Sequence, residues 1–497
     1  MQQRAELNER DRIAVGEKLR NAMGPEKVKD DELSKITYSS DVSPVPPQLP
    51  SFVVFPENRD DVVAVLRIAN EYKAPITVMS GGVNVVGTTI PVKDGIVVDL
   101  HRMNRIIDIN TDGGYAVIEP GLNFERFTAA LREKGYRCSV PTTPGGATPV
   151  GNYLSRPTGS LCNRHLDMLL DLEAVLPDGT IFNTGSSAFP NAGSGLRYGP
   201  FPDLAGLFCC SYGTLGIVTK AAIRIYPINE ANRIVISGFD KFSDAIDYVQ
   251  DVTLANIAEQ CITWSWQFAI SLEVRLEGEK YIVPPEIKTQ DPRIPPDGLP
   301  YDFVTVFMSG YEETMRSNER VCAKIAKKHN GRMISKKEMK KIAPWTLKGW
   351  ELLYQEYRTV EPASFGIGKY LAWLTLTEPR QVKEVEKWAM DEFVKFGTLP
   401  VCYYTMPMDF GRAHLFRIFC YPDPANDALV KKIADRYREM YQIALERYGG
   451  VPQRCKSGFP TLGMVGGFGK AMSKIKEAWD PNGIMSPNMG IYEGVEE

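Results

Sequence analysis

Residues 76–87 read Ile-Thr-Val-Met-Ser-Gly-Gly-Val-Asn-Val-Val-Gly, an apolar run that ends in two adjacent glycines. The apolar, β-branched run at 75–79 predicts a short buried strand, because Pro75 and the glycines bound it. Adjacent glycines adopt positive φ without steric cost, so successive backbone N–H groups can point into one concavity. Such a concavity can bind a pyrophosphate without a basic side chain. The stretch therefore predicts a strand followed by an anion-binding turn.

Two further glycine-bearing turns follow. Residues 141–152, Pro-Thr-Thr-Pro-Gly-Gly-Ala-Thr-Pro-Val-Gly-Asn, are small enough to let a flat ring approach the backbone, and Gly213-Thr-Leu-Gly-Ile-Val218 leads into a strand. One glycine pair most often marks an ordinary turn, whereas three such turns at strand ends favour a ligand site. The sequence contains neither the Gly-x-Gly-x-x-Gly fingerprint after a strand nor a P-loop, since Met464 holds the leading glycine position and Ala471 the position of the magnesium-binding Ser or Thr.

The composition bounds the class of protein. A chain of 497 residues fits two domains, and 43% apolar with 24% charged residues is ordinary for a globular protein. A net charge of −3 without a basic run argues against nucleic-acid binding, and no stretch approaches the roughly 20 apolar residues of a membrane span. Four histidines without metal-ligand spacing argue against a metal site. Nine scattered cysteines and a charged N-terminus predict reduced thiols and a cytoplasmic location.

The order of elements predicts an α+β fold in two parts. Short strands and helices fill the first part, after a polar helical arm and a proline-rich lead-in at 1–50. The predicted strands of this part lie at 51–55, 75–79, 95–100, 114–119, 168–176 and 216–226. Longer amphipathic helices follow, which predict a sheet with helices on one face. They lie at 240–257, 312–330, 378–397 and 424–448. The change of pattern after Pro227 and the return of glycines from Gly449 predict domains at 1–227 and 228–448, with 449–497 returning to the first.

A series of segments then occurs in a characteristic order along nearly the whole chain. They are Phe55–Val62, the glycine turn at 80–87, Val98–Leu100, Glu119–Gly121, Val150–Asn152, Leu172–Gly179, Asp203–Phe208, Gly213–Lys220 and Asp480–Ile484. In sequence and order they resemble the superfamily of FAD-binding flavoproteins that contains vanillyl-alcohol oxidase and p-cresol methylhydroxylase. The resemblance implies a two-part FAD-binding domain of the p-cresol methylhydroxylase type, split across both chain ends, with an inserted α+β cap domain that binds the substrate.

The resemblance also implies which residues contact FAD. The turn after the first strand would wrap the pyrophosphate, through Ser80, Gly81, Gly82, Val83, Asn84, Val85 and Val86. The adenosine and the flavin would lie against Pro141, Gly146, Gly151, Asn152, Gly216, Ile217, Val218, Arg454 and Asn488. In this superfamily a histidine or tyrosine near 368–372 can tether the flavin. Tyr370 is the one candidate there, and we expect FAD to be noncovalent.

Two branches of the superfamily compete as the relative of this chain. The D-lactate and glycolate dehydrogenase-like branch has a histidine-rich metal site and a Gly-Glu-His-Gly stretch near the C-terminus, whereas residues 449–458 contain no histidine. The 4-alkylphenol branch has a Tyr-Arg pair there, which Gln453-Arg454 resembles. Arg454 would then stabilise an anionic reduced flavin or a substrate phenolate. The segment Arg412-Ala-His414 also resembles this branch and would put His414 near the flavin.

This sequence departs from the 4-alkylphenol branch at two places. Gln453 replaces the tyrosine that helps to bind the phenolate, and Arg164 stands where a carboxylate is usual beside flavin N5. An arginine cannot accept a proton at neutral pH but can hold an anionic group, so a carboxylate-bearing substrate stays open. His165 is the nearby titratable base. The aromatic residues expected to wall the substrate pocket are Tyr354, Tyr357, Tyr370, Trp373, Tyr403 and Tyr404.

The sequence therefore predicts an FAD-dependent oxidase or dehydrogenase. It would take a hydride from a benzylic, phenolic or alcohol-type carbon of a small substrate, with Arg454, Arg164, His165 and His414 as catalytic residues and Tyr370, Tyr403 and Gln453 as substrate contacts. Two alternatives stay open: a metal-free 2-hydroxy-acid dehydrogenase, and a non-catalytic FAD-binding subunit of an electron-transfer complex. The resemblance also implies a homodimer and an electron acceptor that could be a protein.

Overall fold

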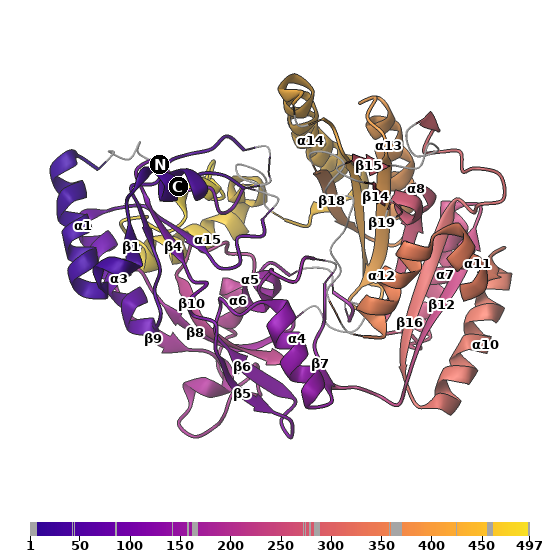
Figure 1. Cartoon of the computed structure of the whole chain (residues 1–497), viewed down its shortest axis with the longest axis horizontal. Helices are drawn as coiled ribbons and strands as arrows, with labels where there is room; N and C mark the ends of the chain where they lie inside the picture. The colour runs from indigo at the N-terminus through magenta and orange to yellow at the C-terminus, as the bar shows by residue number, and fades with distance from the viewer. Residues whose placement is uncertain are drawn as a thin grey trace.

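A computed structural model describes residues 7–41, 43, 45–84, 87–141, 143–156, 159–161, 167–271, 273, 275–277, 280–282, 289–356, 358, 370–423, 425–454 and 461–495. The chain forms two lobes (Figure 1). The N-terminal elements, in indigo and purple, share the first lobe with the C-terminal helix α15 (Gly466–Trp479), in yellow. The pink and orange elements in between form the second lobe.

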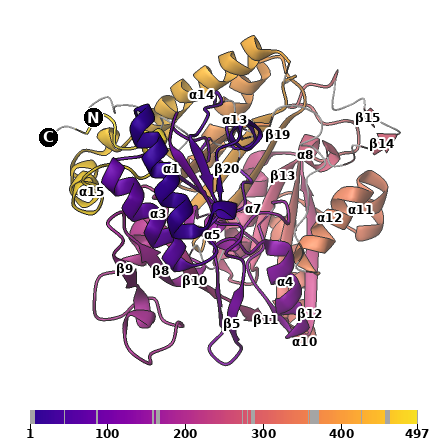
Figure 2. The same cartoon turned by 60° about the vertical axis from the view of Figure 1, so that its left-hand side comes forward.

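The first lobe contains a four-stranded sheet in the order β1-β2-β4-β3. Its strands are β1 (Val28–Lys29), β2 (Phe52–Val54), β4 (Ile96–Asp99) and β3 (Ile76–Met79), of which the last three are parallel. Helices α1 (Glu9–Met23) and α3 (Arg59–Tyr72) lie side by side on this sheet (Figure 1 and Figure 2). The side chain of Asn58 caps α3 by accepting from the Asp61 N–H at 2.9 Å, which fixes where the helix begins.

The second sheet of this lobe is antiparallel, in the order β5-β6-β10-β8-β9. Its strands are β5 (Ile106–Asn110), β6 (Tyr115–Ile118), β10 (Ile217–Arg224), β8 (Leu169–Val175) and β9 (Ile181–Asn183). All of β8 is buried, as its apolar sequence requires. The smaller elements of the lobe are α2 (Glu32–Thr37), α4 (Phe124–Glu133), α5 (Pro149–Leu154), α6 (Ala205–Phe208), β7 (Tyr136–Arg137) and β11 (Tyr226–Pro227).

The C-terminal segment closes the first lobe. The buried Lys476 ammonium, near the end of α15, pairs with Asp480 and also donates to the Thr214 carbonyl at 2.7 Å. Beyond it, the Ile76 N–H donates to the Ile484 carbonyl at 2.8 Å. These bonds join the end of the chain to β3 and to the loop before β10, at the point where the first glycine turn begins.

The second lobe is built on an eight-stranded antiparallel sheet in the order β17-β12-β16-β13-β19-β20-β18-β21. The strands are β17 (Arg332–Ile334), β12 (Ala231–Phe239), β16 (Asp302–Gly310), β13 (Gln260–Ser265), β19 (Val401–Met408), β20 (Ala413–Cys420), β18 (Leu371–Thr377) and β21 (Val451–Pro452). Strands β14 (Arg275–Glu277) and β15 (Lys280–Ile282) form a separate hairpin.

Helices cover both faces of this sheet. One face packs against the helices α7 (Phe242–Leu254), α10 (Glu312–Lys328), α13 (Val382–Val394) and α14 (Asp427–Tyr448). The opposite face shares a core with the first lobe and with α8 (Trp266–Ser271) and α12 (Pro344–Tyr354), which follows α11 (Lys336–Ile342). This opposite face therefore meets the first lobe, and the side chains on it are the ones that can reach a site between the lobes.

A buried ion pair fixes the two lobes together. Arg137, on β7 of the first lobe, donates two hydrogen bonds to the Glu259 carboxylate, at 2.9 and 2.8 Å. Both side chains are almost completely buried. The neighbouring Gln260 donates from Nε2 to the Gly159 carbonyl at 2.6 Å. A bidentate pair of this kind is geometrically specific, so it holds β13 in one position against the first lobe.

The predicted α+β fold class is confirmed. The predicted helices at 240–257, 312–330, 378–397 and 424–448 are present within a few residues of the expected bounds. The expectation of helices on one face only is wrong, because α12 packs on the other face, with Tyr354 against Phe307 and Trp350 against Trp264. Among the described helices, none is long and apolar enough to cross a membrane.

The buried carboxyl of Glu386 in the second lobe is expected to make the free energy of unfolding depend on pH. Glu386, on α13, accepts from the Tyr301 hydroxyl at 2.8 Å, and burial raises its pKa from 4.5 to about 7. The folded protein therefore keeps this proton up to about pH 7 whereas the unfolded chain releases it near 4.5, so stability falls as the pH rises through this window. We expect Glu386→Gln to raise the free energy of unfolding above pH 7 by about 1–3 kcal/mol.

Well below pH 4.5 the same substitution is expected to change the unfolding free energy little, because the carboxyl is then neutral in both the folded and the unfolded protein. Urea unfolding followed by circular dichroism at several pH values measures this difference. Glu384→Gln, an exposed position on the same helix, is the matched control. A difference between Glu386→Gln and the parent that does not change with pH would show that the pKa of this carboxyl is not raised in the folded protein.

Candidate FAD and active site

The three glycine turns meet at one cavity of about 410 Å³. It lies between the end of β3, helix α5, the start of β10 and strand β20 of the second lobe, which we call the cap from here on. The expected cofactor residues that line it are Ser80, Gly81, Gly82, Val83, Asn84, Pro141, Gly151, Asn152, Gly216, Val218 and Arg454. The structure thus brings together residues that lie far apart in the sequence, as predicted from the turns.

Two of these glycines are required by close packing between the turns. A Cβ on Gly81 would lie 2.9 Å from the Gly146 carbonyl oxygen and 3.0 Å from Thr148 Cγ2. A Cβ on Gly151 would lie 2.6 Å from Ser80 Oγ. Gly82 next to them has φ +65°, a conformation that favours glycine. The first and second turns are therefore in direct contact, and their backbones form the wall of the cavity.

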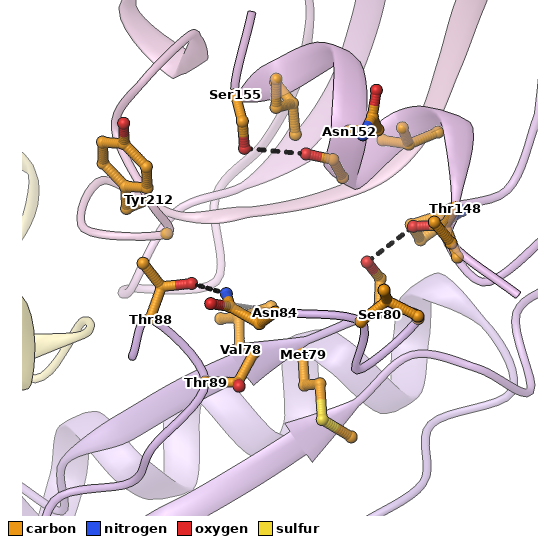
Figure 3. Close-up of a pocket in the computed structure, with 18 of the residues that line it drawn as sticks. Val78, Met79, Ser80, Asn84, Thr88, Thr89, Thr148, Asn152, Ser155 and Tyr212 are labelled. Carbon is orange, nitrogen blue, oxygen red and sulfur yellow. Dashed lines mark hydrogen bonds between the residues drawn. The ribbon is translucent and has the colours of Figure 1, made fainter. Parts of the chain in front are cut away.

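Polar groups of the two turns face one another across this wall. The hydroxyls of Ser80 and Thr148 are 2.8 Å apart, and Figure 3 shows them pointing toward each other from the end of β3 and the start of α5. Asn84 donates to the Thr88 hydroxyl in the same turn. Asn152 lines the cavity, and its buried Oδ1 has no hydrogen-bond partner. A buried polar atom without a partner costs about 1–3 kcal/mol, so this one indicates a ligand that donates to it.

Two arginines line the opposite side of the cavity, Arg417 from β20 and Arg454 after β21. Arg417 donates from Nη1 to the Tyr404 hydroxyl at 2.8 Å, and its guanidinium lies over the rings of Tyr370 and Tyr404, 5.2 and 5.5 Å from their centroids. The Nε atoms of both arginines are buried without a hydrogen-bond partner. Burial and the neighbouring positive charge of Arg417 lower the pKa of Arg454.

The alternation of β19 and β20 decides which cap residues reach this cavity. Tyr404 and Arg417 are directly opposite each other on the face toward the first lobe. Tyr403 lies on the opposite face, where its hydroxyl donates to Asp302 at 2.6 Å. His414 is also on that face, 3.0 Å from Gln250 of α7, and burial lowers its pKa to about 4. The structure therefore does not bring Tyr403 or His414 to the cavity, against the sequence-based expectation, because their strand positions face the helices.

Other expected residues lie beside the cavity and not on its wall. Ile217 points the other way from Gly216 and Val218, into the core beneath the first sheet. Asn488 donates to the Ile90 carbonyl at 2.5 Å, and Gln453 donates to the Arg156 carbonyl at 3.3 Å. Gly146 lines a neighbouring cavity on the far side of Gly81.

The aromatic cap residues divide in the same way. Tyr370 is buried against Arg417 and Phe419, Tyr354 packs on Phe307, and Trp373 faces the helices of the cap. The expected residues Val85, Val86, Arg164, His165 and Tyr357 lie outside the described residues. The identity of a catalytic base therefore stays a prediction.

The sequence reasoning missed Arg417, which is the second cation of the cavity. Its signal is visible in β20, Ala-His-Leu-Phe-Arg-Ile-Phe-Cys, where a lone arginine interrupts an apolar strand. An arginine at a position that alternation assigns to a buried face needs a partner in the interior. Tyr212, which lines the cavity with φ +53°, was missed because nothing in the sequence marks a tyrosine for that conformation.

The cavity fits a dinucleotide with a diphosphate and a flat ring system. Backbone amides at 80–84 can hold a diphosphate, the small residues at 141–151 leave room for a ring, and the Asn152 oxygen can accept a hydrogen bond from it. Residues 50–185 match the FAD binding domain family. The first lobe is therefore an FAD-binding domain, and FAD is the cofactor. The fold is that of p-cresol methylhydroxylase, and the resemblance predicted from the sequence is confirmed.

Comparison with particular proteins extends this identification. The crystal structure of p-cresol methylhydroxylase with substrate bound superposes with a TM-score of 0.84 at 22% identity and covers 98% of both chains. The 4-cresol dehydrogenase [hydroxylating] flavoprotein subunit of Pseudomonas putida is 30% identical over 222 residues, 42% of each chain. Glycolate oxidase subunit GlcD of Bacillus subtilis is 28% identical over 247 residues, 49% of this chain and 51% of that protein. The matched region spans about half the length of these curated relatives or less.

Proposed function

We propose that the protein is an FAD-dependent oxidoreductase that removes a hydride from a benzylic, phenolic or alcohol-type carbon of a small substrate. One observation carries this proposal: the cavity formed by the glycine turns of the FAD-binding domain is closed on its other side by Arg417 and Arg454 of the cap. Fold likeness to a p-cresol methylhydroxylase and sequence likeness to a 4-cresol dehydrogenase support the substrate class.

When bound, FAD supplies the hydride acceptor, and the residues of this chain supply binding and charge. Backbone amides of 80–84 would hold the diphosphate, and Gly81 and Gly151 allow the two turns to come close together there. Arg454 presents a positive charge on the cavity wall, where it would stabilise the negative charge that the flavin gains with the hydride. Tyr404, by accepting from Arg417, orients that guanidinium. The interlobe pair of Arg137 and Glu259 keeps the cap at a fixed distance from the cofactor lobe.

A metal-free 2-hydroxy-acid dehydrogenase is the second candidate. It is favoured by the likeness to a glycolate oxidase subunit and by the two buried guanidiniums, which could hold a carboxylate without a metal. Within the described ranges, no group of three His, Cys, Asp or Glu side chains could hold a metal ion. A non-catalytic FAD-binding subunit is the third candidate.

We propose the same domain organisation that the sequence predicts. The FAD-binding domain comprises 1–227 and 449–497, and 228–448 forms the cap, with β21 at 451–452 joining the cap sheet before the chain returns. FAD is held noncovalently, and Tyr370 is the residue at which a covalent bond would form. The protein is cytoplasmic and homodimeric, and it passes electrons to oxygen or to an acceptor that could be a protein.

Anaerobic titration of the FAD-loaded protein with a panel of 4-alkylphenols and a panel of 2-hydroxy acids tests this proposal. We expect loss of the oxidised flavin absorbance with a member of one panel, and turnover of a dye acceptor with the same compound. If neither panel reduces a flavin that dithionite does reduce, the protein is not an oxidoreductase of these classes. The third candidate, a non-catalytic FAD-binding subunit, is then favoured.

A further inference from the structure

Two positive charges share the cap side of the cavity without a negative partner. In the described part of the chain, the charged and polar neighbours that act on these two guanidiniums are tyrosines and, for Arg454, the Arg417 guanidinium, with no carboxylate among them. Arg417 donates to the neutral Tyr404 hydroxyl at 2.8 Å. The Nε–H groups of both arginines are buried and unbonded. The buried Arg137 at the lobe interface, by contrast, pairs with the Glu259 carboxylate.

Such an arrangement is unfavourable unless an anion completes it. A buried charge needs a partner of opposite sign, and two like charges in one cavity repel each other. Burial and the charge of Arg417 lower the pKa of Arg454, which reports the same repulsion. Because the Tyr370 and Tyr404 rings cover Arg417 on its remaining sides, the open direction for a counter-ion is the cavity that both arginines line.

The chemistry of the two guanidiniums favours a carboxylate over a phenol. Guanidinium N–H groups form parallel pairs with the two oxygens of a carboxylate, and two arginines can each bind one oxygen. A carboxylate carries its full charge at neutral pH, whereas a phenol with a pKa near 10 must first release a proton. The described residues of the second lobe that line this side of the cavity are Arg417 and Arg454, and neither can take up such a proton at neutral pH.

We propose that the substrate carries a carboxylate, bound between Arg417 and Arg454, and that Arg417 is the residue that selects for it. This inference rests on the proposed function, because it concerns the substrate of the same cavity. It narrows the substrate class to acids that also bear an oxidisable C–H bond, aromatic or hydroxylated. A neutral 4-alkylphenol would leave at least one guanidinium unpaired and therefore bind weakly.

Binding of redox-inert acids tests the inference without turnover. Benzoate and 4-chlorobenzoate are titrated into the oxidised FAD-loaded protein, with benzamide and 4-chlorobenzamide as neutral counterparts of similar shape. The flavin absorbance change and isothermal titration calorimetry report binding. We expect the acids to bind at least about 10-fold more tightly than the neutral compounds, and Arg417→Gln to weaken acid binding by about 10- to 100-fold while leaving the neutral compounds unchanged.

Two further variants keep the test decisive. Arg417→Lys retains a charge but loses the paired N–H geometry, and is expected to recover part of the acid affinity. Arg412→Gln removes an exposed arginine of the β19–β20 turn that pairs with Asp409, and is expected to bind acids like the parent. Flavin absorbance and the thermal unfolding midpoint of each variant show whether it is folded and loaded.

The outcomes separate this inference from the proposed function. Equal binding of acids and neutral compounds, or full acid affinity in a folded Arg417→Gln protein, overturns the inference even if a neutral phenol reduces the flavin. Acid binding that depends on Arg417 supports the inference even if none of the substrate panels reduces the flavin, in which case the proposed oxidation is what fails.

Discussion

Replacement of Gly81 by valine is expected to yield a protein that purifies with little or no flavin. The new side chain begins at a Cβ 2.9 Å from the Gly146 carbonyl oxygen and 3.0 Å from Thr148 Cγ2, closer than real contacts allow. The first and second glycine turns must then separate, which moves the amides that we propose hold the diphosphate. Overpacking of this kind costs about 1–3 kcal/mol, and we expect FAD affinity to fall by about 10- to 100-fold or more.

The measurement is the ratio of flavin to protein absorbance after purification, followed by titration of the apoprotein with FAD. Gly467→Ala is the matched control, because a Cβ at that position of α15 meets no atom within 4 Å. Circular dichroism shows whether the Gly81→Val protein is folded. A folded Gly81→Val protein that retains a full complement of FAD would mean that the glycine turn does not bind the cofactor.

Replacement of Arg454 by methionine is expected to slow substrate oxidation by about 10²- to 10³-fold, the usual effect of removing one buried group that stabilises developing charge. Methionine keeps the length of the aliphatic stem, so packing against the cavity changes little. The FAD complement should remain close to that of the parent, because the amides that we propose hold the diphosphate lie in the other lobe.

Stopped-flow measurement of flavin reduction at saturating substrate isolates this effect from binding. Arg438→Met, an exposed position on α14, is the matched control. Arg454→Lys should recover part of the rate, since it restores a positive charge without the paired N–H geometry. A reduction rate in Arg454→Met within about threefold of the parent would contradict a role for this charge in the reaction.

The cofactor side of the site could be predicted from the sequence because its signals are local. A residue type can indicate that a position needs an unusual backbone conformation or a close approach of another segment. This is so for the adjacent glycines at 81–82, the small residues around Gly151 and the Gly216–Val218 turn. Ile217 shows the limit, because alternation along β10 turns it away from the cavity that its two neighbours line.

The cap side could not be predicted in the same way. Alternation places Tyr403 and His414 on one face of their strands and Tyr404 and Arg417 on the other. Which face meets the cofactor depends on where α7, α13 and α14 pack, and this is a property of the whole lobe. Resemblance alone favoured His414, whereas the structure buries it against Gln250. Assigning each residue of β20 to one face by alternation would have identified Arg417 as a charged residue among apolar ones on its face.

The visible absorption spectrum of the purified protein, before and after acid precipitation, tests the central claim most directly. We expect the two absorption bands of oxidised flavin in the native protein, and release of the flavin into the supernatant when the protein precipitates. A colourless protein that takes up no added FAD at micromolar concentration would contradict the assignment of the cavity and of the chemistry drawn from it.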